Sequence, residues 1–286
     1  MAPQYLAEDL LRMEGFTEIE FVDIKTQLGP DALAEGKIDF SLWDGASSVW
    51  AMDREKGFMV LSGVHAGCWD LVGSDRVRAI RDMRGKKIAI RTLGDIDHAW
   101  ISSVLAFVGI SPINGVEWII SSSYANSMRM FVEGSVDAIL ATPPRAQELR
   151  TKKIGHVLVD SSQDRPWAQY FCCLLTSSRE FAVRYPVATK RVMRALLKAA
   201  DICANEPERA ARFMVTKGFA PSYPMAFAVL RGLPYGGWRE LDPEDTLRFY
   251  ALRLHEAGMI KTSPNKLIAQ STDWRFMNEL RRELKG

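Results

Sequence analysis

Apolar positions along the first 178 residues switch between helical and strand spacing. Leu6, Leu10 and Met13 recur at i, i+4 and i+7 ahead of Gly15, which predicts a helix over 4–14. Further helices or helical turns are expected from 29, and over 47–56, 80–84, 97–108 and 126–133, between strands at 19–24, 38–42, 58–61, 69–72, 87–90, 116–120, 136–140, 156–159 and 170–176. Because this alternation is typical of βαβ units, we expect a parallel sheet in each block.

The last third of the chain shows helical signals only. Helices are expected around 187–205, 207–217, 225–231, 243–257 and 273–285. A βαβ start with an all-helical finish suggests that the chain leaves a first lobe, builds a second, and returns to cover the first.

One short pattern occurs twice. Glu35-Gly36-Lys37-Ile38-Asp39-Phe40-Ser41-Leu42 and Glu133-Gly134-Ser135-Val136-Asp137-Ala138-Ile139-Leu140 each read as a helix end, a Gly stop and a strand. The first strand runs into the loop Trp43-Asp44-Gly45, and the second into Ala141-Thr142-Pro143-Pro144. Ligands of open α/β sheets bind beyond the carboxyl ends of the strands. The repeat therefore predicts two lobes that face each other across a cleft.

Composition narrows the function classes. The 286 residues carry a net charge of +2 with scattered basic residues, which does not favour a nucleic-acid partner. The longest uncharged stretch, 99–116, is interrupted by glycine and proline and does not resemble the ~20 apolar residues of a membrane span, so we expect no membrane insertion. The four cysteines lack the spacing of a metal site, and Cys172-Cys173 is expected in a buried strand, so no metal is expected.

Four segments carry a resemblance to a known family. They are Ala2-Pro3-Gln4-Tyr5-Leu6-Ala7-Glu8-Asp9-Leu10-Leu11 with Glu14-Gly15-Phe16, the paired repeat, Ile80-Arg81-Asp82-Met83-Arg84-Gly85-Lys86-Lys87, and Thr272-Asp273-Trp274-Arg275-Phe276-Met277-Asn278-Glu279-Leu280. Together they resemble the solute-binding proteins of ABC importers, in the branch that serves nitrate, taurine, aliphatic sulfonates and thiamine-pyrimidine precursors.

The resemblance implies an α/β, two-lobe type II periplasmic-binding-protein fold with a helical C-terminal region. Its two crossovers are expected at 66–77 and 160–172, with lobe one formed by 1–67 and 172–286 and lobe two by 68–171. It also implies a monomer that binds a small organic molecule without a cofactor, delivers it to an ABC transporter permease, and works in the periplasm.

The start of the chain departs from the family pattern. Family members begin with a secretion signal and a strand that lies centrally in lobe one, whereas here Met1 falls at the start of the first helix and no signal peptide is recognised. We therefore expect the first strand of lobe one to be missing. The alternatives are a shortened chain, a misassigned start, or a cytoplasmic relative.

The loop after the first repeat holds the sharpest site candidate. Asp44 falls where the strand should open into the cleft, Trp43 offers a flat contact surface, and Gly45 follows. The plain alternative is a turn Asp followed by a permissive Gly. Thr142 is the counterpart across the cleft and could donate a hydroxyl hydrogen bond, or could be an ordinary turn residue.

A second group follows the strand 87–90 and opens the next helix. Thr92, Gly94, Asp95 and His98 are candidates there. A free helix N-terminus favours anions, but Asp95 or Asp97 at this end would use that field, one of them as a cap. Their presence argues against a bare sulfonate or nitrate at this spot. His98 could equally point along the helix into solvent.

The remaining candidates lie near the expected crossovers and at the first helix. His65 and Cys68 fall at the first crossover, and Trp167 near the second, where packing is the competing interpretation. Tyr124 follows a strand end, and Tyr5 would face the cleft by family analogy. Acidic and aromatic candidates together suggest a flat or cationic nitrogenous ligand.

The alternative function is an enzyme on the same fold, similar to a thiamine-pyrimidine-precursor synthase. His65, His98 and Cys172-Cys173 leave it open, while GxSxG, HExxH and Gly-rich phosphate-loop motifs are not found. No catalytic residue is therefore assigned, and a solute-binding protein is the favoured interpretation.

Overall fold

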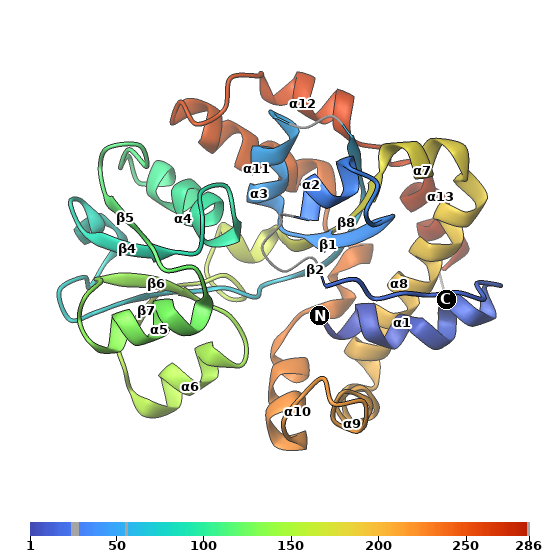
Figure 1. Cartoon of the computed structure of the whole chain (residues 1–286), viewed down its shortest axis with the longest axis horizontal. Coiled ribbons are helices and arrows are strands. Elements are labelled where there is room, and N and C mark those ends of the chain that lie inside the picture. The colour runs from blue at the N-terminus through green and yellow to red at the C-terminus, as the bar shows by residue number, and fades with distance from the viewer. Residues whose placement is uncertain (24–28, 55–56, 285–286) are drawn as a thin grey trace.

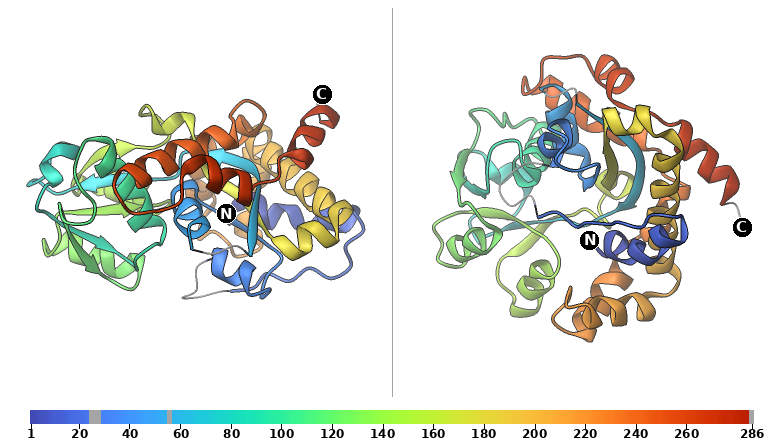
Figure 2. Two further views of the ribbon diagram at one scale, coloured as in Figure 1. Left: turned by 90° about the horizontal axis from the view of Figure 1, so that it is seen from above. Right: turned by 45° about the vertical axis from the view of Figure 1, so that its right-hand side comes forward.

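The computed structural model describes residues 1–23, 29–54 and 57–284, and it contains two separate β-sheets surrounded by helices. Figure 1 shows the sheet with β4 to β7 on the left and the sheet with β1, β2 and β8 to its right, with the N-terminus below β2 at the start of α1. The further views in Figure 2 show the long C-terminal helices gathered around the second of these groups.

The first sheet has the strand order β1-β8-β2 and the second β5-β4-β6-β3-β7. The strands are β1 (Phe40–Trp43), β2 (Phe58–Ala66), β3 (Asp70–Gly73), β4 (Lys87–Ile90), β5 (Glu117–Ile120), β6 (Ala138–Ala141), β7 (His156–Asp160) and β8 (Phe171–Ser178). The chain passes from the first sheet to the second between β2 and β3, and returns between β7 and β8.

The expectation of a parallel sheet in each block is wrong for the first sheet. β8 pairs antiparallel with both β1 and β2, because it enters from the second sheet and lies between two strands that run the other way. In the second sheet β4 is parallel to β5 and β6, whereas β3 is antiparallel to β6 and β7. In each sheet, the strand that follows a crossover, β8 or β3, therefore runs antiparallel to both of its neighbours.

The helices follow the expected pattern in most places. They are α1 (Ala2–Met13), α2 (Gly29–Ala34), α3 (Gly45–Met52), η1 (Ile80–Met83), α4 (Ile96–Phe107), α5 (Tyr124–Val132), α6 (Arg145–Lys152), η2 (Trp167–Gln169), α7 (Arg179–Arg184), α8 (Pro186–Asn205), α9 (Pro207–Thr216), α10 (Tyr223–Gly232), η3 (Tyr235–Arg239), α11 (Pro243–Glu256), α12 (Pro264–Ser271) and α13 (Arg275–Glu283). The sequence pattern missed α6, α7 and α12, which have eight residues or fewer, and the short 3-10 helices η2 and η3.

The strand expected over 19–24 is not formed in its described part, 19–23. Residues 16–22 instead face residues 37–42 across a groove of about 920 Å³, so the segment does not reach the free edge of β1. A strand needs a hydrogen-bonding neighbour, and apolar alternation alone does not supply one. Residue 24, and residues 55 and 56 of the helix expected over 47–56, lie outside the described residues.

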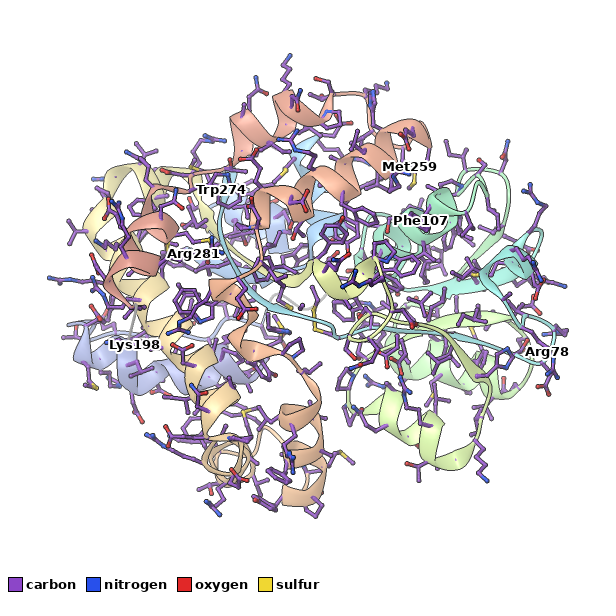
Figure 3. The ribbon with its side chains drawn as sticks, turned by 180° about the vertical axis from the view of Figure 1, so that it is seen from behind. Arg78, Phe107, Lys198, Met259, Trp274 and Arg281 are labelled. Carbon is purple, nitrogen blue, oxygen red and sulfur yellow. A yellow bond between two sulfur atoms is a disulfide. The ribbon has the colours of Figure 1, made fainter. Side chains whose placement is uncertain are left out.

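One hydrophobic core joins buried side chains of both sheets and of the helices packed on them. All nine residues of β2 are buried, and the large side chains of Phe58, Phe171, Trp100 and Trp238 are almost fully enclosed. Each such side chain contributes roughly 1.5–3 kcal/mol by leaving water. Phe107, at the end of α4 and labelled in Figure 3, lies against Phe249 of α11 with ring centroids 6.3 Å apart, so α4 of the second sheet packs on the C-terminal region.

Within the part of the chain that the structure describes, no helix combines the length and apolar character needed to cross a membrane.

Candidate functional site

A cavity of about 420 Å³ lies between elements of the two sheets. Its lining includes the loop after β1, the loop after β6, the start of α1 and the region of α9 and α10. Trp43 is the last residue of β1 and Asp44 follows it, and Thr142 and Pro143 come from the loop after β6. The two loops of the sequence repeat thus line one cavity, as the repeat predicted.

Asp44 is the acidic residue in this lining. It is the N-cap of α3, and its carboxylate accepts a hydrogen bond from the Ser47 backbone N–H at 3.0 Å and another from the Ser47 hydroxyl. The side chain is fully buried, and this desolvation raises the pKa of Asp44 to about 7; the nearby charge of Asp95 raises it further, while the Ser47 bonds oppose the shift. Asp44 can therefore hold or release a proton near neutral pH.

The plain alternative for this loop required Gly45 to be a flexible turn residue, and the structure does not place it in a turn. It is the first residue of α3, and a Cβ there would lie 2.9 Å from the ring of Tyr250. Gly45 allows α11 to approach the start of α3, and it does not line the cavity. Its place behind Asp44 makes it a packing residue.

The second sheet presents three helix starts to the cavity. Ile96 begins α4, Tyr124 begins α5, and Pro143 and Pro144 precede α6. The α4 start is capped by Asp95 and the α5 start by Ser123, whose side chains accept backbone N–H bonds. Pro144, the N-cap of α6, makes no side-chain cap bond.

Asp95 and Asp97 are held by Arg91 rather than directed into the cavity. The Arg91 guanidinium lies 2.6 Å from Asp95 and 3.7 Å from Asp97, and its Cζ is 4.0 Å from the ring centroid of Tyr124. Burial and the neighbouring Asp95 charge raise the pKa of Asp97 to about 6 despite Arg91. Asp95 caps α4, and both carboxylates pair with Arg91. The site candidate Asp95 does not line the cavity.

Thr92, Gly94, His98 and Trp167 also lie outside the cavity lining. His98 is buried between Trp50 and Trp118 and accepts the Gly94 N–H at 3.0 Å, so it does not point into solvent. Burial lowers its pKa to about 4. Thr92 is exposed, and Trp167 packs on Phe107 with centroids 5.4 Å apart.

His65 and Cys68 reach the cavity from the end of β2 and the crossover that follows it. Cys68 forms a disulfide with Cys172, at the start of β8, and Cys173 remains a free buried thiol. The sequence had not indicated this disulfide. Burial lowers the pKa of His65 to about 4, which leaves the imidazole neutral at physiological pH. The disulfide joins the two segments by which the chain passes between the sheets.

The largest part of the lining was missed by the sequence interpretation. It is an apolar wall from the α9–α10 region, formed by Met214, Phe219, Ala220, Pro221, Met225, Ala226, Val229, Leu230 and Leu233. Phe219 stacks on Tyr5 at 3.8 Å between centroids. Phe219 and Met225 are both more than one third exposed. Clustered exposed apolar side chains mark a binding surface, but the helical pattern of the sequence does not show which apolar residues will be exposed.

Seven of the expected residues therefore share the cavity. They are Tyr5, Trp43, Asp44, His65, Cys68, Tyr124 and Thr142. The other six, Gly45, Thr92, Gly94, Asp95, His98 and Trp167, lie outside it. Among the residues that the structure describes, the lining is mostly apolar, with the carboxyl group of Asp44, the imidazole of His65 and a few hydroxyl groups.

A profile of the NMT1-like family matches residues 29–216, which is more than half of the chain. The chain belongs to the NMT1-like family. A search of curated proteins gave no match to this NMT1-like chain.

Many solved structures share the fold of this NMT1-like chain. One is the alkanesulfonate-binding protein SsuA from Xanthomonas axonopodis pv. citri bound to MOPS, with 20% identity, coverage of 96% of this chain and 95% of that one, and a TM-score of 0.76. Another is the periplasmic nitrate-binding protein NrtA from Synechocystis PCC 6803, with 13% identity, coverage of 99% and 86%, and a TM-score of 0.79. The desulfurization enzyme DSZB also matches, with 14% identity, coverage of 99% and 95%, and a TM-score of 0.63.

At these identities the comparison establishes the fold and not the activity. The expected two-lobe periplasmic-binding-protein architecture is confirmed for the NMT1-like chain. Binding proteins and an enzyme share it, so the function has to be argued from the cavity.

Proposed function

We propose that this protein is the solute-binding component of an ABC-type importer and holds a small organic molecule in the cavity between two lobes. The observation that carries the proposal is that the loops after β1 and β6, one from each sheet, line the same cavity. Lobe one would comprise 1–67 and 172–286, and lobe two 68–171. Closure of such lobes on a ligand is a hinge motion.

The ligand class follows from the cavity's chemistry. Most of the lining is apolar or aromatic, and its carboxyl group is Asp44. A sulfonate or nitrate would place a fixed negative charge in the same apolar cavity as this carboxyl, which is unfavourable once Asp44 ionises. A flat nitrogenous or cationic molecule could instead donate to Asp44 while its ring packs on Trp43 and the apolar wall.

Anions are the competing ligand class, because two proteins of similar structure are named for the anions that they bind. One is named for an alkanesulfonate and the other for nitrate. Tyr124, Thr142 and the start of α6 offer hydroxyl and N–H groups that would serve an anion. The experiment must therefore compare both classes directly.

A thermal-shift panel tests the proposal. Aminopyrimidines and small amines should raise the melting temperature of the purified chain more than taurine or nitrate does, because only they complement Asp44. Substituting Asp44→Asn should abolish the difference, while Glu148→Gln, a change on the exposed face of α6, should not. Stronger stabilisation by the anions would contradict the proposed ligand class but not the carrier role.

The carrier role has its own test. Isothermal titration with a hit from the panel should give reversible 1:1 binding, and mass spectrometry should recover the hit unchanged. Conversion of the bound molecule would favour an enzyme on this fold. As a carrier the protein would act as a periplasmic monomer and dock on an ABC permease, which co-purification with the permease checks.

A further inference from the structure

Four metal-ligand groups meet at one end of the cavity. His65, Cys68, Cys172 and Cys173 each offer a ligand atom, and these atoms all lie within 4.8 Å of one another. Three sulfurs and one imidazole form the Cys₃His set found in tetrahedral zinc sites. The solute proposal gives none of the four a role in metal binding, and the sequence spacing did not suggest one.

A β-bulge brings the two adjacent cysteines to one side of β8. His65 pairs with Cys173 and Ala66 pairs with Phe171, so Cys172 is an extra residue opposite this step of β2. Neighbouring strand side chains normally point to opposite faces, but a bulge re-aims one of them. The Cys172 and Cys173 sulfurs therefore lie only 3.3 Å apart.

The imidazole of His65 has a backbone partner of the kind that supports metal-ligating histidines. Its Nδ1 lies 3.0 Å from the carbonyl oxygen of Ala66, to which it can donate a hydrogen bond. Such a backbone partner fixes the tautomer and leaves the lone pair on Nε2, an arrangement common among metal-ligating histidines; in this structure Nε2 lies 3.4 Å from the Sδ of Met1, which a bound ion would displace. The Cys68 sulfur lies beside both ring nitrogens, 3.9 Å from Nε2 and 3.7 Å from Nδ1.

Reduction of the disulfide completes the donor set. In this structure Cys68 is bonded to Cys172, so Cys173 is the one thiol among the three cysteines of the cluster. A trialkylphosphine cleaves the S–S bond with one water: phosphorus is oxidised and takes the water oxygen, and the two sulfurs, reduced by two electrons, take its two protons. Three thiols then face His65.

We propose that the chain with Cys68–Cys172 reduced binds one Zn²⁺ ion through the thiolates of Cys68, Cys172 and Cys173 and through Nε2 of His65. Thiolates bound to zinc at ~2.3 Å lie roughly 3.8 Å from each other. Cys68 and Cys173 are 3.9 Å apart, so the main change is the separation of Cys68 from Cys172. Each thiol releases its proton as it binds.

The ion has a route into the site. His65, Cys68 and Cys173 all line the 420 Å³ cavity, so Zn²⁺ can enter where the solute does. The Sδ of Met1 lies 2.9 Å from the Cys173 sulfur and adds a further soft atom beside the four ligands. Because Cys68 follows β2 and Cys172 begins β8, the bound ion would tie together both segments that connect the sheets.

The test measures metal binding by the full chain, before and after anaerobic treatment with a phosphine. After removal of free metal, the reduced chain should retain one Zn²⁺ per chain and the disulfide form none. Co²⁺ in place of Zn²⁺ should give the visible bands of a tetrahedral thiolate site. Both results are independent of any transport assay.

Matched variants assign the ligands. Cys173→Ser and, at a half-buried position, Cys68→Ser should each weaken Zn²⁺ binding by more than about tenfold, since even changes in groups that only support the ligands cost that much. Cys203→Ser alters a buried free thiol in α8 outside the cluster and should leave binding and spectrum unchanged. A reduced chain that retains no zinc, or folded Cys173→Ser and Cys68→Ser proteins that bind it as the native chain does, would overturn the proposal.

Discussion

The carboxylate of Asp44 accepts the backbone N–H of Ser47 at 3.0 Å, so one side chain both caps α3 and faces the solute cavity. A cap favours the ionised carboxylate because it sits at the positive end of a helix. Burial favours the neutral acid, and burial wins, since the pKa of Asp44 rises to about 7. Stability and ligand binding should therefore both respond to pH through this group.

The free energy of unfolding of the ligand-free protein should depend on pH through Asp44. Between the unfolded pKa near 4 and the folded pKa near 7, the native state holds a proton that the unfolded chain has lost, so the Asp44 contribution falls as pH rises. We expect the free energy of unfolding of the native chain, relative to Asp44→Asn, to drop by up to about 4 kcal/mol across this window. Urea unfolding followed by tryptophan fluorescence measures it.

Comparison with the variant is essential because other groups titrate in the same range. The pKa of Asp97 is also raised, whereas the pKa values of His65 and His98 are lowered, so the histidines contribute stability that is lost as pH falls below about 6.5. These contributions cancel in the difference between the two proteins. Parallel pH profiles for the native chain and Asp44→Asn would show that Asp44 is not the group involved.

Binding of a cationic solute should strengthen with rising pH. Such a solute prefers ionised Asp44, so affinity should increase up to about pH 7 and then level off. Isothermal titration in buffers of different ionisation enthalpy should detect proton release below that pH. An anionic solute would show the reverse trend, so the sign of the slope separates the two ligand classes.

Arg91 is predicted to stabilise the folded protein by neutralising the buried carboxylates of Asp95 and Asp97 at the start of α4. Substituting Arg91→Ala leaves Asp95 and Asp97, both nearly fully buried, without their cation. Removing one partner of a buried pair costs roughly 3–5 kcal/mol. The loss should be larger at neutral than at acidic pH, because protonation relieves the carboxylates.

The control for Arg91 is Arg129→Ala. Arg129 pairs with Glu133 at 2.7 Å on an exposed face of α5, where an ion pair contributes about 0–1 kcal/mol. Denaturant unfolding of both variants at two pH values makes the comparison. Equal, small losses would show that Arg91 does not stabilise the carboxylates.

The sequence predicted the elements whose signals are local. Gly85 and the apolar run after it placed β4 at its observed bounds, 87–90, and the paired repeat brought Asp44 and Thr142 to one cavity. The strand expected from residue 19 failed because pairing depends on a neighbour's position, which apolar alternation does not encode. The antiparallel insertion of β8 is likewise a property of the whole topology.

The candidate site divides in the same way. Trp43 and Asp44 follow directly from a strand end, so their place could be read from the chain. The apolar wall lies more than 150 residues later, around Phe219 and Met225, and meets Tyr5 only after the C-terminal helices fold back. Asp95 and His98 are residue types common in binding sites, but Asp95 is paired with Arg91, and His98 is packed between Trp50 and Trp118.

The apolar wall should contribute to affinity more than to stability. Phe219 is 43% exposed, lines the cavity and stacks on Tyr5, so Phe219→Ala removes a contact surface without opening a core void. We expect affinity for an aromatic solute to fall by about tenfold, in line with ~1 kcal/mol for an aromatic pair plus lost area. Val187→Ala, on an exposed site of α8 away from the cavity, should leave affinity unchanged. A similar affinity for both variants would place the solute away from this wall.

Gly94 should be intolerant of any side chain, for a reason that a second glycine isolates. Both Gly94 and Gly109 have positive φ, +81° and +73°, where an alanine costs roughly 1–2 kcal/mol. A Cβ at Gly94 would also lie 2.3 Å from Nε1 of Trp50, whereas at Gly109 it would meet nothing within 4 Å. Because Trp50 packs on His98, Gly94→Ala must also displace the start of α4. It should therefore destabilise the protein clearly more than Gly109→Ala in thermal unfolding, and equal melting temperatures would show that Trp50 moves aside freely.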